Sequence, residues 1–257
     1  MRIVSLCPSL TELVFDLDRG GDLVGVTRFC IHPADGVAAV ENVGGTKDPR
    51  TERIIELAPD LVLLNEEENR IEDAEALRTA EIPCHVSFPR TVADTAVMVR
   101  SIGAAIHASA EAERIALDIE TREQRVRAAA RGQRLVRFAY LIWREPIMVA
   151  AADTFVDALL GLTGGENVFS AREERYPTVT AEELTLADPA GVLLSTEPFP
   201  FQDRHADELS ELTGLPRDRF RFVDGELLSW HGSRTPRGID YAESVIADLR
   251  RVTEDLG

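Results

Sequence analysis

The stretch ERIIELAPDLVLLNEE at residues 52–67 decides the fold, because the chain repeats it as EELTLADPAGVLLSTE at residues 182–197. Without a gap, the identical positions are Glu52 and Glu182, Pro59 and Pro189, Val62 and Val192, Leu63 and Leu193, Leu64 and Leu194, and Glu67 and Glu197. A period of this length is too long for a solenoid. It indicates two similar lobes, and small ligands favour the cleft at such a boundary.

Strands and helices alternate on both sides of the repeat. Apolar runs predict strands at residues 2–6, 23–26, 61–64 and 85–87, and again at residues 134–141, 168–169, 192–195 and 220–223. Residues 9–12 and 180–183 have the form of capping boxes, and Asp153 is expected to cap a helix over residues 154–162. This alternation predicts an α/β fold with parallel sheets.

A long helix is predicted between the two repeated halves. Residues 110–130 contain no glycine or proline and are rich in Ala, Glu and Arg, which are strong helix formers. Such a helix would span roughly 32 Å. The predicted domains are therefore an N-terminal α/β lobe (1–108), a connecting helix (109–131) and a C-terminal α/β lobe (132–257). The alternative is an ordinary packing helix within one domain.

Composition limits the kind of partner. The 257 residues are 44% hydrophobic and 28% charged, as in globular proteins. A net charge of −17 argues against nucleic acid and anionic membranes, although a well-solvated surface explains it equally. The chain has no apolar run long enough to span a membrane. It begins with a strand and not a leader, so we expect a cytoplasmic protein, or a periplasmic or cell-surface one if a leader was removed.

The candidate site residues follow the predicted strands, where α/β sheets place their ligands. Aromatic walls with a few polar groups are typical of such sites. The predicted ligand-binding residues are Arg28, Phe29, His32, Lys47, Glu67, Glu68, Trp143, Arg144, Glu197, Phe199, Trp230 and Arg234. The aromatic members would stack on the ligand, the cations would hold anionic groups, and Glu67 and Glu197 would accept hydrogen bonds or complete a metal site. Alternatively, Arg144 and Arg234 pair with these two carboxylates, and residues 66–68 form a solvated loop.

Metal binding and catalysis have weaker support in the sequence. Cys30 and His32 would share a face and, with Cys7, bind a soft metal; a partly buried Cys and His is the simpler interpretation. The three cysteines form no CxxC, which argues against a disulfide framework or a structural zinc site. There is no nucleophile elbow, P-loop or GxGxxG, so no catalytic constellation and no cofactor are expected.

The order of motifs resembles one known family over essentially the whole chain. RIVSLCPSLTE, VGVTRFCIHP, VGG and ERIIELAPDLVL match its first lobe, and IWREP, GGENVF, YPTVTAEEL and DGELLSWHGSR match its second. The chain is similar to class III (helical-backbone) ABC-transporter substrate-binding proteins of the cobalamin- and ferric-siderophore-binding type. The resemblance implies two Rossmann-like lobes joined by one long helix, a ligand held between them, and no catalysis.

The resemblance also assigns roles to single residues. It implies that Glu52 and Glu182 dock into arginine pockets of an ABC permease, whereas the alternative is a first-turn glutamate that only favours the helix dipole. It places a corrin-contacting aromatic on Phe29 and a second on Trp230.

The predicted function is that of a monomeric, non-catalytic binding protein for a metal chelate (a corrinoid, haem or ferric siderophore) that it delivers to an ABC transporter. The charged set among the candidates also fits a ligand smaller and more polar than cobalamin. Two alternatives stay open. One is a cytoplasmic sensor or carrier without a permease, and the other is an enzyme that uses residues 66–68 as acid or base on a polar metabolite.

Overall fold

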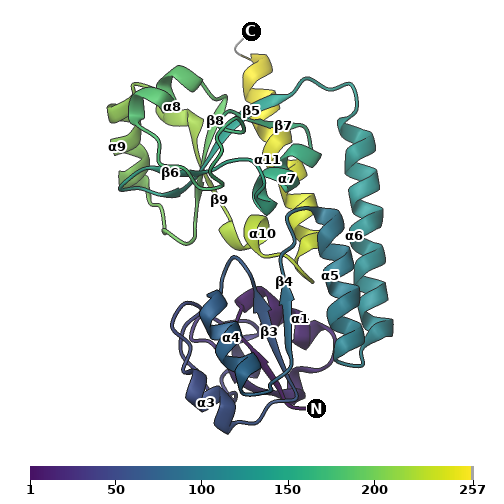
Figure 1. Ribbon diagram of the computed structural model, residues 1–257. Helices are drawn as coiled ribbons and strands as arrows, with labels where there is room; N and C mark the ends of the chain where they lie inside the picture. The colour runs from purple at the N-terminus through teal and green to yellow at the C-terminus, as the bar shows by residue number, and fades with distance from the viewer. Residues whose placement is uncertain (256–257) are drawn as a thin grey trace. The chain divides into compact units, whose positions relative to one another are not determined.

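The protein forms two compact α/β units in the computed structural model, which describes residues 1–255 (Figure 1). The first unit holds residues 1–89, 93–120 and 231–234, and the second holds residues 90–92, 121–230 and those from 235 onward. The two-lobed α/β fold class predicted from the sequence is confirmed. Among the helices of this described part, none has both the length and the apolar character that crossing a membrane requires.

The first unit is built on a parallel sheet in the strand order β2-β1-β3-β4. The strands are β1 (Ile3–Ser5), β2 (Leu23–Val26), β3 (Leu61–Asn65) and β4 (Cys84–Ser87). They alternate with the 3-10 turn η1 (Gly20–Asp22) and with α1 (Pro8–Asp16), α2 (Ala34–Val37), α3 (Thr51–Glu56), α4 (Ile71–Thr79) and α5 (Val92–Ala105). All residues of β3 are buried, as expected for a parallel strand covered on both faces.

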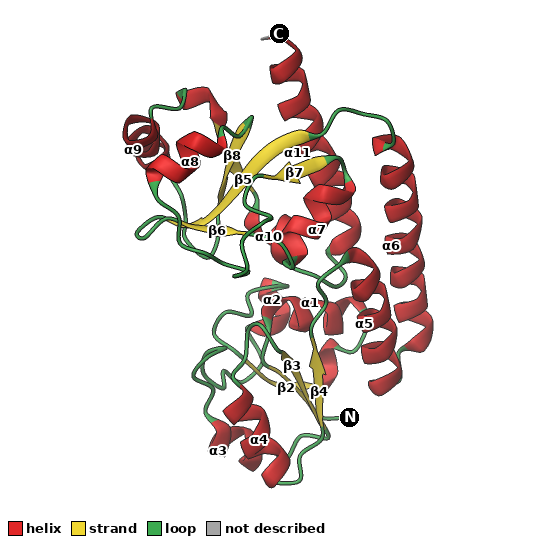
Figure 2. Ribbon diagram, turned by 45° about the horizontal axis from the view of Figure 1, so that its top comes forward, coloured by secondary structure: helices red, strands yellow, loops and turns green. Residues whose placement is uncertain are grey.

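Alternation along the strands divides their side chains between the two faces of this sheet. Val4 and Val62 pack in one apolar cluster with Ile54 of α3 and Leu77 of α4. Figure 2 shows α3 and α4 together on this face of the sheet, with α1 on the other. Burial on both faces holds the carboxyl end of β3 in place, and the candidate residues Glu67 and Glu68 follow that end.

The second unit is built on a sheet in the order β6-β5-β8-β9, with β7 also paired to β5. The strands are β5 (Val136–Trp143), β6 (Met148–Ala150), β7 (Gly165–Asn167), β8 (Gly191–Ser195) and β9 (Phe220–Val223). The predicted parallel sheet is observed in β5, β7, β8 and β9, and one edge strand differs, because β6 is antiparallel to β5. The chain returns from β5 through a short turn, which joins antiparallel strands, whereas a parallel strand needs a long crossover.

Helices cover both faces of the second sheet as well. Leu184 and Leu209 pack with Val192 in the larger apolar cluster of this unit. They come from α8 (Ala181–Ala187) and α9 (Asp203–Thr213), which lie on one face, whereas α7 (Phe155–Leu162) and α11 (Thr235–Asp255) lie on the other (Figure 2). The 3-10 turn η2 (Arg217–Arg219) and α10 (Gly225–Ser229) flank β9.

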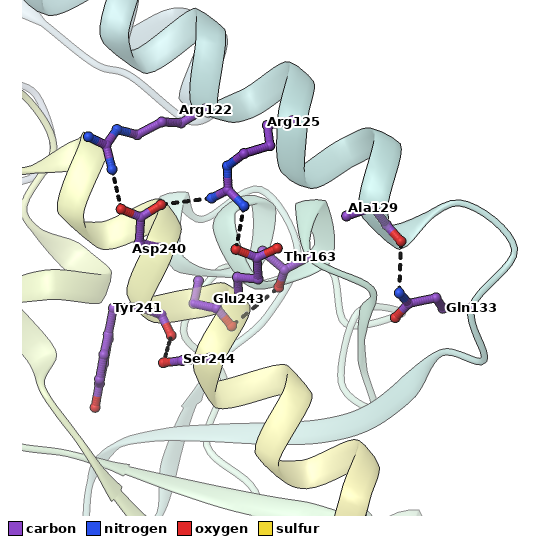
Figure 3. A network of polar contacts seen from close by, with 10 residues as sticks. Arg122, Arg125, Ala129, Gln133, Thr163, Asp240, Tyr241, Glu243 and Ser244 are labelled. Carbon is purple, nitrogen blue, oxygen red and sulfur yellow. Dashed lines mark hydrogen bonds and ion pairs between the residues drawn. The ribbon is translucent and has the colours of Figure 1, made fainter.

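The predicted long helix is observed as α6 (Ser109–Ala130). Its residues up to 120 belong to the first unit and the rest to the second. Within the second unit, Arg122 and Arg125 of α6 both pair with Asp240 of α11, and Arg125 also lies 2.7 Å from Glu243 (Figure 3). The four side chains are partly exposed, so each pair contributes little alone, but Asp240 joins two of them into a network.

Two capping predictions are wrong. Residues 9–12 do not form a capping box: α1 begins at Pro8 with Cys7 as N-cap, so Ser9 lies inside the helix, and its buried hydroxyl contacts the Cys7 thiol at 3.3 Å. Asp153 does not cap α7, because its backbone is left-handed, at φ 64°. Thr154 is extended, as an N-cap must be, and its hydroxyl accepts the amide of Asp157. The box at residues 180–183 is confirmed.

Candidate ligand-binding site

Asn65 organises the loop that follows β3. Its side-chain oxygen accepts the backbone amides of Glu67 and Glu68, at 2.9 and 3.1 Å. Lys47 donates to the backbone oxygen of Glu67 at 2.6 Å. Asn69, the last residue of the turn, donates to the backbone oxygens of residues 6 and 46, so the loop is tied to the neighbouring strand end. The structure therefore brings three predicted residues together: Glu67 and Glu68 lie in this loop, and Lys47 contacts it.

The side chain of Glu68 is partly buried. Burial raises the pKa of Glu68, and the charge of Lys47 partly opposes this shift. Burial, followed by the charge of Glu68, raises the pKa of the Cys7 thiol to about 12. Cys7 is therefore protonated at neutral pH and is a poor nucleophile and metal ligand.

Residues 231–234 come from the far end of the sequence but belong to the first unit. His231 is buried, and its Nε2 accepts the side-chain amide of Asn65 at 3.0 Å, while its Nδ1 lies 3.5 Å from the Ser9 hydroxyl. Burial lowers the pKa of His231 to about 4, so the ring is neutral at physiological pH. Arg234, a predicted ligand contact, makes two hydrogen bonds to the carboxylate of Glu12, at 2.7 and 2.8 Å. This segment therefore holds the Asn65 side chain in place through His231.

The loop after β2 presents an aromatic ring. Phe29 is 49% exposed, and the guanidinium of Arg28 lies 4.9 Å from its ring centre. Arg28 is held by Asp48 at 2.9 Å. Around Cys30 and His32, as elsewhere among the described residues, no group of three or more His, Cys, Asp or Glu side chains is placed to hold a metal ion. Cys30 is buried among hydroxyl groups, which supports the simpler interpretation of a buried thiol.

The second unit repeats the arrangement around Asn65 with different residues. Ser195 stands 130 positions after Asn65, and its hydroxyl accepts the amide of Glu197 at 3.3 Å. The buried phenol of Tyr140 donates to the same hydroxyl at 2.9 Å. The residue at the end of each repeated strand thus shapes the loop that carries the equivalent glutamate. The sequence indicated Asn65 and Ser195 because both stand at the end of the repeated strand.

Four rings gather beyond this loop. Phe199 contacts Trp143 at 5.4 Å, Phe201 at 4.8 Å and His205 at 5.1 Å between ring centres. Trp143 is 41% exposed, whereas Phe201 and His205 are buried. The cluster therefore presents Trp143 to solvent on a packed aromatic base. Sequence reasoning found Trp143 and Phe199 but missed His205, since one histidine in a helical stretch carries no spacing signal.

Two further candidates, Arg144 and Trp230, already make contacts within the protein. The alternative in which Arg144 and Arg234 pair with Glu67 and Glu197 is not observed for Arg144, which pairs with Glu208 at 2.5 Å and with Glu145 at 3.3 Å. Trp230 is only 9% exposed. Its ring is already packed, which leaves little surface for stacking on a ligand.

Glu52 and Glu182 occupy matching surface positions. Each is exposed and lies in the first turn of its helix, α3 or α8. The carboxylate of Glu182 is not needed as the cap of α8, since Glu183 closes the capping box there.

Comparison with known proteins gives consistent results. The family described as periplasmic binding protein matches residues 3–213. A vitamin B12-binding protein of Vibrio cholerae is 26% identical over 252 residues, which cover 97% of this chain and 89% of that protein. Two solved structures share the fold with a TM-score of 0.84 each. The vitamin B12-binding protein BtuF of Vibrio cholerae is 22% identical and covers 97% of both chains, and the haem-binding protein RhuT of Roseiflexus is 24% identical, covering 96% of this chain and 98% of that one.

Proposed function

Because the chain belongs to the periplasmic binding protein family, we propose that it binds a metal chelate and delivers it to an ABC transporter. It is a non-catalytic binding protein, as the family is. Its relatives include proteins named for vitamin B12 and for haem. Both ligands are large, flat, metal-centred macrocycles, so a corrinoid, a haem or a ferric siderophore is the proposed ligand class.

The observation that carries this proposal is two exposed aromatic side chains, one on the loop that follows β2 and one at the carboxyl end of β5. Phe29 is 49% exposed and Trp143 is 41% exposed, although large aromatic groups gain free energy from burial. Each is held by neighbours, Phe29 under Arg28 and Trp143 against Phe199. Ordered, exposed aromatic rings at the carboxyl ends of strands suit the flat face of a ligand.

The other predicted site residues are proposed to act around these rings. His32, Lys47, Glu67, Glu68, Arg28, Arg144 and Glu197 would supply the polar contacts. Trp230 and Arg234 are proposed to act mainly by holding the structure, because Trp230 is buried and Arg234 is paired with Glu12. No resident cofactor is proposed, since the chelate itself is the cargo.

Delivery requires a docking surface, and we assign it to Glu52 and Glu182. Both are exposed, and they occupy equivalent positions in the repeated helices. We propose that the protein acts as a monomer outside the cytoplasmic membrane, and the two similar solved structures are of periplasmic proteins.

Equilibrium binding with single variants tests the proposal. Trp143→Ala should weaken binding of the best chelate by about 1–3 kcal/mol if the ring is an anchor. Leu212→Ala is a matched control, because Leu212 is also apolar and exposed but lies late in α9. Equal affinities for the wild-type protein and Trp143→Ala would remove the ring from the site.

A further inference from the structure

The first turn of α9 carries an arginine, Arg204, and a histidine, His205, at the edge of the aromatic cluster. The helix starts at Asp203, directly after the loop that carries Glu197 and Phe199. Arg204 is exposed, whereas His205 is only 7% exposed. None of the predicted site residues comes from this turn.

The hydrogen bonds of His205 fix which of its nitrogen atoms carries the proton. Nδ1 lies 3.0 Å from the backbone amide of Gln202, which donates to it at the helix start. Burial, followed by the positive charges of Arg204 and Arg144, lowers the pKa of His205, so the ring is neutral. A neutral imidazole has one donor and one acceptor nitrogen. With Nδ1 as the acceptor, Nε2 must carry the hydrogen.

The group that faces this Nε2–H is another donor. The Nε of Arg204 lies 3.1 Å from His205 Nε2, and a guanidinium has no acceptor atom. The opposite tautomer would only move the conflict to the Gln202 amide, which the helix start fixes in place, whereas Arg204 is exposed and can turn. Two N–H groups therefore converge without an acceptor between them, and across the described residues Arg204 has no carboxylate partner.

A buried donor without an acceptor is costly, so such a group calls for an explanation. One oxyanion placed between the two nitrogens would satisfy both, and a carboxylate can accept from each with a separate oxygen. The start of a helix also favours negative charge. The neighbouring cation, Arg144, is already neutralised by Glu208, so it adds no competing site.

We infer that Arg204 and His205 form a subsite for a carboxylate carried by the ligand, next to the ring of Phe199. Phe199 lies 5.1 Å from His205 and 5.4 Å from Trp143, so the aromatic base and the donor pair are contiguous. The inference rests on the proposed function and narrows it to chelates that bear free carboxylates. A haem-type macrocycle and a carboxylate siderophore share this chemistry, whereas an amide-substituted corrinoid lacks it.

Nuclear magnetic resonance of the His205 ring tests the subsite without a chelate. Benzoate should shift the His205 Nε2 signal saturably, and benzamide, which has the same ring but no charge, should not. The shift should disappear in Arg204→Gln and persist in Arg127→Gln, a control that removes an equal charge from a helix-surface pair with Glu123. No shift with benzoate, or the same shift with benzamide, would overturn the inference.

Chelate binding tests the same point on the proposed ligand class. Haemin should bind roughly tenfold to a hundredfold more tightly than its dimethyl ester, and Arg204→Gln should remove most of that difference. Binding of ferric citrate would indicate a carboxylate siderophore and not a macrocycle as the ligand. Arg204→Gln should leave the affinity for cyanocobalamin unchanged. Haemin and its ester binding equally would overturn the inference and leave the proposed function standing. A benzoate response with no chelate bound would instead refute the function and keep the subsite.

Discussion

Arg2 and Arg137 make the same contact in the two units. The Nη2 of Arg2 donates to the backbone oxygen of Leu57 at 2.7 Å, and the Nη2 of Arg137 donates to that of Ala187 at 2.7 Å. Leu57 and Ala187 are equivalent in the repeat and close α3 and α8, whose last carbonyl groups lack helical partners. The duplication therefore extends beyond residues 52–67 and 182–197 to the strands beside them.

Loss of this contact should cost stability. Arg137→Met should lower the free energy of unfolding by about 1 kcal/mol, since a typical net hydrogen bond contributes that much and the helix end also favours a cation. Urea unfolding of the purified protein measures it. Arg251→Met is the control, because both partners of its pair with Asp248 are exposed on one helix, and the pair should contribute only a few tenths of a kcal/mol. Equal losses in the two variants would contradict the assignment.

The ion pair between Glu12 and Arg234 should matter far more than surface pairs. Their side chains are 17% and 10% exposed, so removing one partner leaves a largely desolvated charge. Arg234→Met should therefore destabilise the protein by about 3 kcal/mol. The double variant Glu12→Gln/Arg234→Met should recover part of that loss, and chemical denaturation of all four proteins gives the coupling. Strictly additive losses would show that the two residues do not act as a pair.

Protonation of His231 should make stability fall in acid. Its pKa is about 4 in the folded protein and 6.5 when unfolded, so the unfolded chain binds the proton more tightly. The contribution is therefore complete above pH 6.5 and is lost as pH falls from there to about 4, by about 3 kcal/mol in total. Unfolding curves between pH 4 and 7 should show this slope reduced in His231→Gln.

The carboxylates of the protein also titrate in this range, so the informative quantity is the difference between wild type and His231→Gln. His107→Gln provides the control, because it removes a histidine that is exposed. An identical pH dependence in wild type and His231→Gln would contradict the assignment of a buried, neutral ring.

If Glu52 and Glu182 form the docking surface, reversing their charges should impair binding to the permease but not binding of the chelate. Glu52→Arg and Glu182→Arg together should weaken the complex with the permease by at least tenfold, because each reversal places like charges at the interface. Affinity for the chelate should stay within error of the wild type. Reversal of Glu72 and Glu111, two other first-turn glutamates, is the control. Unchanged capture by the permease would assign the two residues to simple helix stabilisation.

Much of the fold was predictable because its signals are local or repeated. The apolar runs gave β2 and β9 with correct bounds, and the composition of residues 110–130 gave α6 to within one residue. The strand after α7 was misplaced, since Gly165 pairs with Val136 although a double glycine suggests a break. Antiparallel β6 was missed because three residues between a turn and a loop carry no periodicity.

The site was only partly predictable, since its geometry depends on contacts across long stretches of sequence. Candidates at or shortly after the carboxyl end of a strand, such as Trp143 and Phe29, were found from their place in the pattern. The support of Asn65 by His231 joins residues far apart in the chain, and only the fold brings them together. The donor pair of Arg204 and His205 depends on a tautomer, which no sequence pattern reveals.

The most direct test of the central claim is a thermal-shift panel of the purified protein with haemin, cyanocobalamin, ferric siderophores, ferric citrate and bare divalent metals. A ligand at 100 times its Kd should add about 2.7 kcal/mol of stability, which raises Tm by roughly 2–4 °C for a chain of this size. A binding protein for metal chelates predicts a shift with one chelate class and none with the bare metals. Shifts with the bare metals alone, or with nothing in the panel, would contradict it.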